Sequence, residues 1–219
     1  MEEKSLSFSF SARYYTEGTL NGATRQVWIV LHGYGQLARF FIKKFEKLAD
    51  QNIYVLAPEG ISTFYLSELT GQGRKDNKVG ATWMTSENRL TDIDNYVHFL
   101  DALYEKELKA FPHVPVTVLG FSQGCATACR WAVRGEKIVF NKLILWAGLF
   151  PPDMDFKAGH ELLAHKQTFM VVGDHDPYLT AERMKEFDQL AAQLGIQPEK
   201  ITFAGKHEIR EEVFPQLIG

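Results

Sequence analysis

The sequence of 219 residues contains only two cysteines, Cys125 and Cys129. A disulfide framework needs more cysteines, and a zinc site needs further Cys or His residues at ligand spacing. The two cysteines stand four residues apart, on one side of a predicted helix, and we interpret them as small packing residues of the core. We therefore expect neither a disulfide nor a metal site.

Concentrated charge and long apolar runs are also missing. The formal net charge is −3 and the 24 basic residues are scattered, so we expect no nucleic-acid partner. The N-terminal MEEKSLSFSF resembles no secretory signal, and no apolar run approaches the roughly 20 residues that cross a bilayer. We expect a cytoplasmic protein with no stable membrane insertion, and the sequence does not indicate its oligomeric state.

Segments with strand and helix patterns alternate along the chain. After an opening that we interpret as a β-hairpin, most strands are continuous apolar runs, which is typical of a parallel sheet covered on both faces. We therefore predict one domain over residues 1–219, with three layers and a mostly parallel central sheet. The predicted strands are 6–18, 25–33, 53–58, 114–121, 142–149, 167–173 and 200–205; the predicted helices are 37–50, 88–111, 125–133, 180–195 and 210–218. Residues 60–83 and 151–160 are predicted to be loops.

The segment GFSQG, residues 120–124, lies where a predicted strand ends and a helix of small residues begins. Ligands of parallel sheets bind beyond the carboxyl ends of the strands, so this is a place to look for chemistry. A serine on such a turn is lifted clear of the sheet, and its neighbours two positions away must be small, as Gly120 and Gly124 are. Taken alone, the segment could also be a tight turn with a solvated serine.

A serine nucleophile needs a base that is itself held by an acid. Of the seven histidines, His207 follows the last predicted strand, in the segment GKHE. The acid could be Asp174 or Asp176, which follow the preceding strand in GDHDP, although aspartates there could also be turn or cap residues. We prefer Asp176, because Pro177 stiffens its turn. The order Ser122, Asp176, His207 is that of doubly wound hydrolases.

The segment LHGYG after the second strand supplies a second turn of small residues. An oxyanion needs two backbone N–H donors, and we assign them to Gln123, at the start of a helix, and to Tyr34. Because both donors are backbone groups, we expect their side chains to be poorly constrained. His32 is interpreted as structural, pinning the turn by a hydrogen bond.

Together, LHGYG, GFSQG, GDHDP and GKHE resemble the phospholipase/carboxylesterase family of the α/β-hydrolase superfamily, which includes acyl-protein thioesterases. The resemblance extends from about Val27 to the C-terminus. It implies an α/β-hydrolase fold without a separate cap domain. It also implies Ser122 as nucleophile, Asp176 as acid and His207 as base, with the Tyr34 and Gln123 amides as oxyanion hole. The sequence departs from the family after Trp83, where Met84 and Thr85 replace an aromatic and an acidic residue.

These features predict a serine hydrolase that cleaves small-molecule esters or thioesters with a small to medium apolar acyl group and needs no cofactor. The apolar residues expected near the substrate are Phe64, Tyr65, Trp83, Leu149, Phe150 and Tyr178, several of which could instead cap the core. The alternatives are a peptidase or a lyase on the same fold, or a binding protein that has lost turnover.

Overall fold

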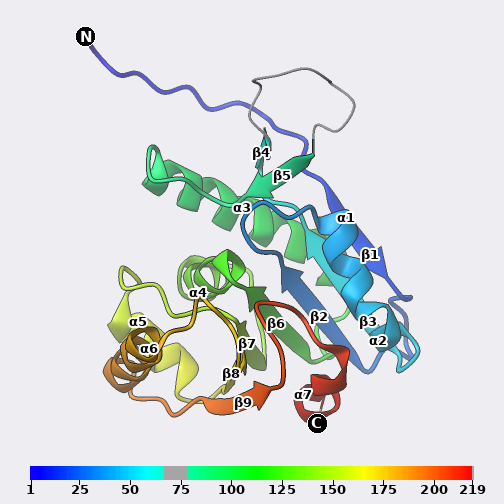
Figure 1. Cartoon of the computed structure of the whole chain (residues 1–219). Helices are drawn as coiled ribbons and strands as arrows, with labels where there is room; N and C mark the ends of the chain where they lie inside the picture. The colour runs from blue at the N-terminus through cyan, green and yellow to red at the C-terminus, as the bar shows by residue number, and fades with distance from the viewer. Residues whose placement is uncertain (67–77, 219) are drawn as a thin grey trace, which may run out of the picture.

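A seven-stranded sheet runs through the computed structural model, which describes residues 1–66 and 78–218 (Figure 1). The strand order is β1-β3-β2-β6-β7-β8-β9, and every pairing is parallel except that of β1 with β3. The strands are β1 (Tyr14–Glu17), β2 (Gln26–Leu31), β3 (Ile53–Pro58), β6 (Val116–Phe121), β7 (Lys142–Trp146), β8 (Gln167–Gly173) and β9 (Glu199–Phe203). The central strands are buried along almost their whole length, as their apolar sequence predicts.

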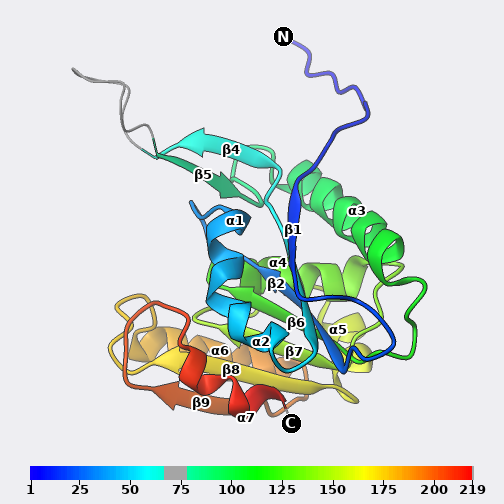
Figure 2. The ribbon, with the colours of Figure 1, turned by 90° about the vertical axis from the view of Figure 1, so that its right-hand side faces the viewer.

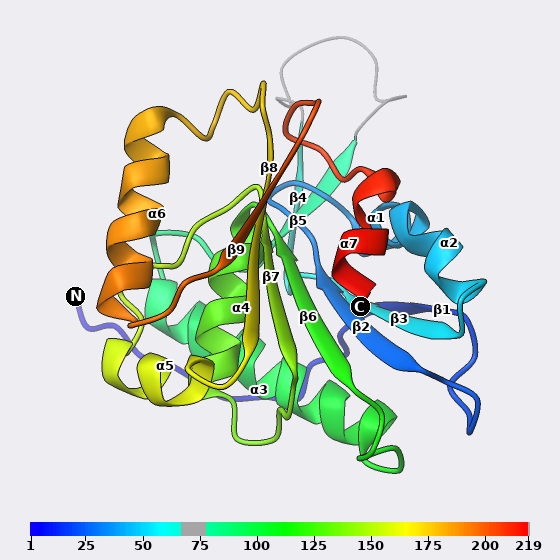
Figure 3. The same cartoon turned by 90° about the horizontal axis from the view of Figure 1, so that it is seen from below.

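Helices cover both faces of this sheet (Figure 3). On one face lie α3 (Arg89–Leu108), α4 (Gln123–Arg134), α5 (Phe156–Leu163) and α6 (Ala181–Gln193). On the other lie α1 (Ala38–Phe41), α2 (Glu46–Ala49) and α7 (Pro215–Ile218). An apolar core fills the space between the sheet and each helical layer. The predicted three-layer α/β architecture is therefore confirmed.

A second, two-stranded sheet stands beside the first and is formed by β4 (Ser62–Tyr65) and β5 (Val79–Thr82) (Figure 2). We predicted an irregular loop over 60–83, which is wrong for these two segments; residues 67–77 of that loop lie outside the described residues. β4 and β5 pair with each other in antiparallel register, from Ser62 with Thr82 to Tyr65 with Val79. β5 also has a partner far away in sequence, because Ala81 pairs with Gln36 and Gly80 packs directly on Gly35. Local sequence pattern does not reveal such a partner.

The predicted opening hairpin is also wrong. β1 pairs with β3, and β3 lies between β1 and β2 in the sheet. The segment before β1, which we predicted as strand from residue 6, has no regular structure and extends away from the body (Figures 1 and 2). Its alternation leaves the apolar side chains Leu6, Phe8 and Phe10 exposed, because no neighbouring strand covers them.

Two helix predictions and one loop prediction need correction. Residues 37–50 form two short α-helices joined by a 3-10 turn, and the backbone leaves the helical region at Phe45. The terminal helix is likewise split into a 3-10 turn, Glu211–Val213, and α7. The predicted loop 151–160 contains the start of α5, which the side chain of Asp155 caps by accepting a hydrogen bond from the amide of Ala158 at 2.9 Å.

Among the described residues, no helix is long and apolar enough to cross a membrane.

Candidate active site

Ser122 lies on a strained turn between β6 and α4. Its φ of 54° and ψ of −114° are unusual for a residue with a side chain, and such strain is held only where the surroundings impose it. The amide of Ser122 donates to the carbonyl of Trp146 at the end of β7, at 2.9 Å. Ala147, which follows β7, also has a positive φ of 54°. Two neighbouring strand ends are therefore both strained at this place.

The glycines around Ser122 explain why the turn can be so tight. A Cβ on Gly120 would overlap the backbone of Gly124, and a Cβ on Gly124 would overlap the carbonyl group of Leu31. A Cβ on Gly33 would come within 3.2 Å of the Cβ of Ser122. The sequence prediction that this turn needs small residues is confirmed, and the glycine turn after β2 lies directly against the serine.

Asp176 and His207 meet beyond the ends of β8 and β9. The Nδ1 atom of His207 is 2.7 Å from Oδ2 of Asp176, whose side chain is fully buried. The other carboxylate oxygen of Asp176 accepts a hydrogen bond from the amide of Tyr178 at 2.9 Å. The His207 ring packs against the rings of Phe121 and Tyr178, with centroid distances of 4.9 and 4.7 Å. These contacts hold the imidazole and leave its Nε2 atom for another partner.

Asp174, the alternative acid, has different partners. Its Oδ1 atom accepts from the amide of Gly205 at 2.9 Å and contacts Nδ1 of His175 at 2.6 Å. The hydrogen bond from Gly205, followed by that from His175, lowers the pKa of the Asp174 carboxyl below its ordinary value. Its side chain remains substantially exposed, and it fastens the turn after β8 to the turn after β9.

Ser122 and His207 line one pocket of about 420 Å³. No hydrogen bond joins their side chains among the described contacts, and such bonds often tighten only when substrate is present. Of the apolar residues predicted near the substrate, Leu149, Phe150 and Tyr178 line this pocket. Besides Gln123, the other residues of its wall, which were not predicted as substrate-binding, are Ala126, Arg130, Ala147, Gly148, Pro151, Pro152, Leu179, Arg183 and Glu186.

The other three predicted substrate residues lie elsewhere. Trp83 is 1% exposed and its Nε1 donates to the carbonyl of His32 at 2.9 Å, so that prediction is wrong: Trp83 is a core residue. Phe64 and Tyr65 belong to β4 and do not line the pocket of Ser122. Phe64 instead packs on the ring of Tyr34, with a centroid distance of 5.1 Å.

In the turn of residues 33–36, three of the four amides have acceptors. Gly33 donates to Oε1 of Gln36 at 2.8 Å, Gly35 to the carbonyl of Ala81 at 2.9 Å, and Gln36 to the carbonyl of Gly33 at 3.2 Å. The amide of Tyr34 has no acceptor among the described residues. At the start of α4, the amide of Gln123 is one of the first N–H groups of a helix, which have no intrahelical partner. Both amides predicted for the oxyanion hole are thus available.

The side chain of Gln123 is held in place, which corrects our expectation that it would be poorly constrained. Its Nε2 atom donates to Oγ1 of Thr82 at 2.9 Å and to the carbonyl of Met84 at 3.1 Å. Its Oε1 atom accepts from the amide of Trp83 at 3.2 Å. A β5 residue therefore contacts each turn: Thr82 binds Gln123 and Ala81 binds Gly35 and Gln36. The one hint of this connection in the sequence is the glutamine within GFSQG, but its bonding partners lie far away in sequence.

His32 connects the turn after β2 to the end of β3. The side chain is fully buried, its Nδ1 lies 2.8 Å from the carbonyl of Gly33, and its Nε2 accepts from the amide of Gly60 at 2.9 Å. These partners require a neutral ring with the proton on Nδ1. Burial lowers the pKa of His32 to about 4, against the opposing effect of the Gly33 carbonyl. The structural role predicted for His32 is confirmed.

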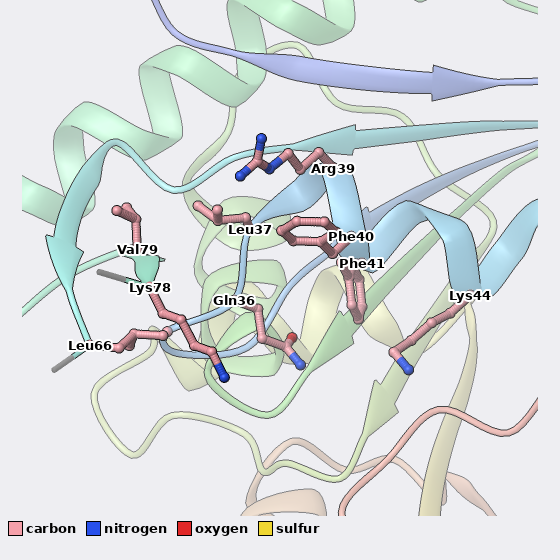
Figure 4. A pocket seen from close by; sticks show the side chains of 10 residues that line it. Gln36, Leu37, Arg39, Phe40, Phe41, Lys44, Leu66, Lys78 and Val79 are labelled. Carbon is pink, nitrogen blue, oxygen red and sulfur yellow. The ribbon is translucent and has the colours of Figure 1, made fainter. Parts of the chain in front are cut away.

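A larger and more apolar cavity, of about 520 Å³, lies on the other side of the glycine turn and does not include Ser122 (Figure 4). It is bounded by α1, by Leu66 and by the start of β5. Figure 4 shows the cationic side chains of Lys44 and Lys78 at its edge.

Within the described ranges, no three His, Cys, Asp or Glu side chains are placed to hold a metal ion. Cys125 and Cys129 are free thiols and fully buried, as predicted. Burial raises the pKa of both thiols well above the ordinary value.

Comparisons with known proteins bear on the family and the fold. A sequence model of the family described as serine hydrolase (FSH1) matches residues 24–211. The structure is similar to Zea mays acyl-protein thioesterase 2, with a TM-score of 0.69 and 17% identity over 94% of this chain and 96% of that chain. It is also similar to esterase PE8, with a TM-score of 0.64 and 18% identity over 95% of this chain and 96% of that one.

The carboxylesterase of Bacillus cereus gives a TM-score of 0.65 and 16% identity, over 94% of this chain and 91% of that chain. At such identities these structural matches show the α/β-hydrolase fold. No curated protein sequence matches the chain.

Proposed function

The chain belongs to the serine hydrolase (FSH1) family, and from that premise we propose that it hydrolyses carboxylic esters or thioesters through an acyl-enzyme intermediate on Ser122. The observation that carries the proposal is the convergence of three strand ends. A strained serine after β6 shares one pocket with a histidine after β9, and that histidine is held by a buried carboxylate after β8.

In the first half of the reaction, Oγ of Ser122 attacks the carbonyl carbon while Nε2 of His207 accepts the hydroxyl proton. The negative charge moves to the carbonyl oxygen, where the amides of Tyr34 and Gln123 donate hydrogen bonds to it. When the tetrahedral intermediate collapses, the bond to the alcohol or thiol breaks and the leaving group takes the proton from His207. Asp176 keeps the imidazole oriented and stabilises its charged form.

In the second half, a water molecule gives a proton to His207 and attacks the acyl carbon. Collapse of the second intermediate breaks the bond to Oγ, returns the proton to Ser122 and releases the acid. The protein's own groups supply the nucleophile, the base and the oxyanion donors in both halves.

We further propose a small to medium apolar acyl group. Leu149, Phe150, Pro151, Pro152 and Tyr178 give the pocket of Ser122 apolar walls, and its volume of about 420 Å³ suits a ligand of modest size. The same acyl-enzyme serves oxygen esters and thioesters, so the geometry supports both substrate classes.

The test is a set of rates on short p-nitrophenyl esters, acyl thioesters and anilides of the same acyl groups, measured for the wild type and for Ser122→Ala. We expect turnover of esters and thioesters that is lost in the variant, and slow turnover of amides. Fast amide cleavage with negligible ester turnover would favour a peptidase. Binding without turnover would favour a protein that has lost catalysis.

A further inference from the structure

Arg130 lies on the same ridge of α4 as the serine turn. Ser122, Ala126 and Arg130 are spaced four residues apart and all line the 420 Å³ pocket. Ser122 directly precedes α4, and at 1.5 Å of rise per residue Arg130 lies about 11 Å along the helix from its first residue, Gln123. Side chains on a helix lean toward its N-terminus, which for Arg130 is the end next to Ser122. Because Ala126 is small, it leaves open the space between Ser122 and Arg130.

The guanidinium of Arg130 has few partners for a group so deeply placed. The residue is 7% exposed, and its Nη2 donates to Oδ1 of Asp153 at 2.7 Å. Its Nη1 contacts the sulfur of Met84 at 3.4 Å, and a thioether is a weak acceptor. Its Nε is buried and has no hydrogen-bond partner. The buried hydroxyl of Tyr96 also interacts with the guanidinium, although it has no hydrogen-bond partner of good geometry among the described residues. Asp153 is therefore the one charged acceptor of Arg130 among the described contacts.

The charges at this end of the pocket do not cancel. The carboxylate of Asp153 is shared, because Arg89 contacts its other oxygen. Burial alone would raise the pKa of Asp153, but hydrogen bonds from Arg130 and then Arg89 lower it below the ordinary value. One carboxylate therefore faces two arginines, of which only Arg130 lines the pocket of Ser122. Asp155, which lines a neighbouring cavity with Arg130, caps α5. Besides His207, the charged residues in the wall of the Ser122 pocket are Arg130, Arg183 and Glu186, so the wall has one more cationic than anionic side chain.

The remaining charged residues of the wall do not remove this excess. Arg183 and Glu186 of α6 also line the pocket, and they form a partly exposed ion pair at 3.4 Å that screens itself. His207, at the other end, is the proposed base. Between the two ends the wall is formed by the apolar residues Leu149, Phe150 and Pro151.

We propose that the pocket selects substrates that carry a carboxylate at the far end of an apolar arm, with Arg130 as the residue that binds it. This inference rests on the proposed function and specifies its substrate class. Guanidinium groups bind carboxylates through paired, charge-assisted hydrogen bonds, and Arg130, which lines the pocket, can supply them from the remaining N–H groups of Nη1 and Nη2. The arm belongs to either the acyl or the alcohol part of the ester.

The competing explanation is that Arg130 only fastens Asp153, and hence the segment after β7, to α4. A purely structural role of this kind does not require the open space beside Ala126. It would also not make the enzyme distinguish charged from neutral substrates. The two explanations therefore differ in one measurable quantity, the ratio of kcat/KM for an acid to that for the neutral compound of equal length.

The first experiment measures this ratio for p-nitrophenyl monoesters of straight-chain dicarboxylic acids against the corresponding neutral acyl esters. A second set places the carboxylate on the alcohol arm. At the best chain length of either set, we expect the wild type to prefer the acid by about tenfold or more, from hydrogen bonds to a charged group. In Arg130→Met the ratio should fall to about one or below, and Arg130→Lys should keep part of the preference.

Arg134→Met is the matched control. Arg134 is on the same helix, pairs with Asp94 at the surface and does not line the pocket, so its replacement should leave both rates and their ratio unchanged. A wild-type ratio near one in both sets, with neutral esters hydrolysed, would overturn the inference and leave the proposed function standing. So would an unchanged preference in folded Arg130→Met.

A binding measurement separates failure of the inference from failure of the proposed function. Keto acids, in which a methyl ketone replaces the ester, are titrated calorimetrically into the wild type against neutral ketones of equal length. Preferential binding of the acids that is lost in Arg130→Met or weakened in Arg130→Lys supports the site even in a protein without turnover. Equal binding of acids and ketones contradicts it, whatever the protein hydrolyses.

Discussion

The turn at Ser122 and the turn at residues 33–36 lie against each other, but they are held by different means. The serine turn is fixed by backbone: its amide bonds to β7, and its glycines touch Leu31 and each other. The glycine turn is fixed by its contacts with β5 and by the side chains of Gln36 and His32. The position of the proposed nucleophile thus depends on the main sheet, whereas the position of Tyr34, the second proposed oxyanion donor, depends on the small sheet of β4 and β5.

The difference matters because the proposed reaction needs the Ser122 hydroxyl and the amides of Gln123 and Tyr34 at fixed positions relative to one another. Gln123 joins the two turns, since its backbone belongs to the serine turn and its side chain bonds to residues 82–84 at the end of β5. Substitutions in the serine turn should therefore abolish turnover. Substitutions that break the side-chain bonds of Gln123 should lower the rate of turnover and leave the fold intact.

The largest expected effect comes from Ser122→Ala, which removes the nucleophile. We expect kcat/KM to fall by about 10⁴-fold or more. Because the hydroxyl has no hydrogen-bond partner within the part of the chain that the structure describes, the free energy of unfolding should change little. Ser122→Gly should be equally inactive but more stable than the alanine variant, by about 1 kcal/mol, because glycine relieves the positive φ. Steady-state rates and urea denaturation measure both quantities; a serine turn without strain would give equal stabilities.

The next effect separates the two aspartates. Asp176→Asn should lower kcat by about 10³-fold or more, because the amide no longer stabilises the charged ring of His207. Asp174 also follows β8, but its carboxylate contacts Gly205 and His175. Asp174→Asn should therefore lower kcat by less than about fivefold. If the Asp174 variant is the more damaged of the two, the assignment of the acid is wrong.

A smaller effect is expected at the link between the turns. Gln123→Ala keeps the backbone amide but loses the bonds to Thr82, Trp83 and Met84. We expect kcat to fall by about tenfold to a hundredfold with KM little changed, because a loosened donor acts on the transition state. Gln189→Ala, on the exposed face of α6, is the control. Equal losses in kcat and in stability would show that Gln123 only supports the fold.

The smallest effect concerns the pH dependence of stability through His32. Its pKa is about 4 in the folded protein and about 6.5 when unfolded, so the unfolded state binds the extra proton between these values. The free energy of unfolding should therefore fall as the solution is acidified, by about 2 kcal/mol from pH 7 to pH 5. His32→Asn should lose this component. Urea denaturation at the two pH values measures the free energy of unfolding. An equal fall in the variant would contradict the assignment of this pH dependence to His32.

The surroundings of Ser122 could be predicted from the sequence, because each element there has a recognisable pattern within its own segment. The run VPVTVLGF predicts a buried strand, and the glycines at 120 and 124 fill places where any Cβ would collide. His207 and Asp176 follow strands, so parallel topology alone brings them to one edge. The layer architecture followed from the same alternation of apolar strands and amphipathic helices.

The sheet of β4 and β5 was not predicted, because its place beside the glycine turn depends on residues far away in sequence. Besides pairing with β4, β5 brings Gly80 and Ala81 against Gly35 and Gln36, and nothing within residues 60–83 indicates that contact. Trp83 was misplaced for the same reason, since an aromatic near a site is core or surface according to packing that local pattern does not contain. The role of Arg130 is likewise visible only when α4 and the segment after β7 are seen together.

The most direct measurement of the central claim is covalent labelling with an organophosphonate, followed by mapping of the modified peptide. If Ser122, His207 and Asp176 act as one unit, the folded wild type should carry a single adduct on Ser122. Labelling should be slowed strongly in His207→Gln and remain fast in Asp174→Asn. A folded protein in which Ser122 stays unlabelled, or in which labelling is indifferent to His207, would contradict the account.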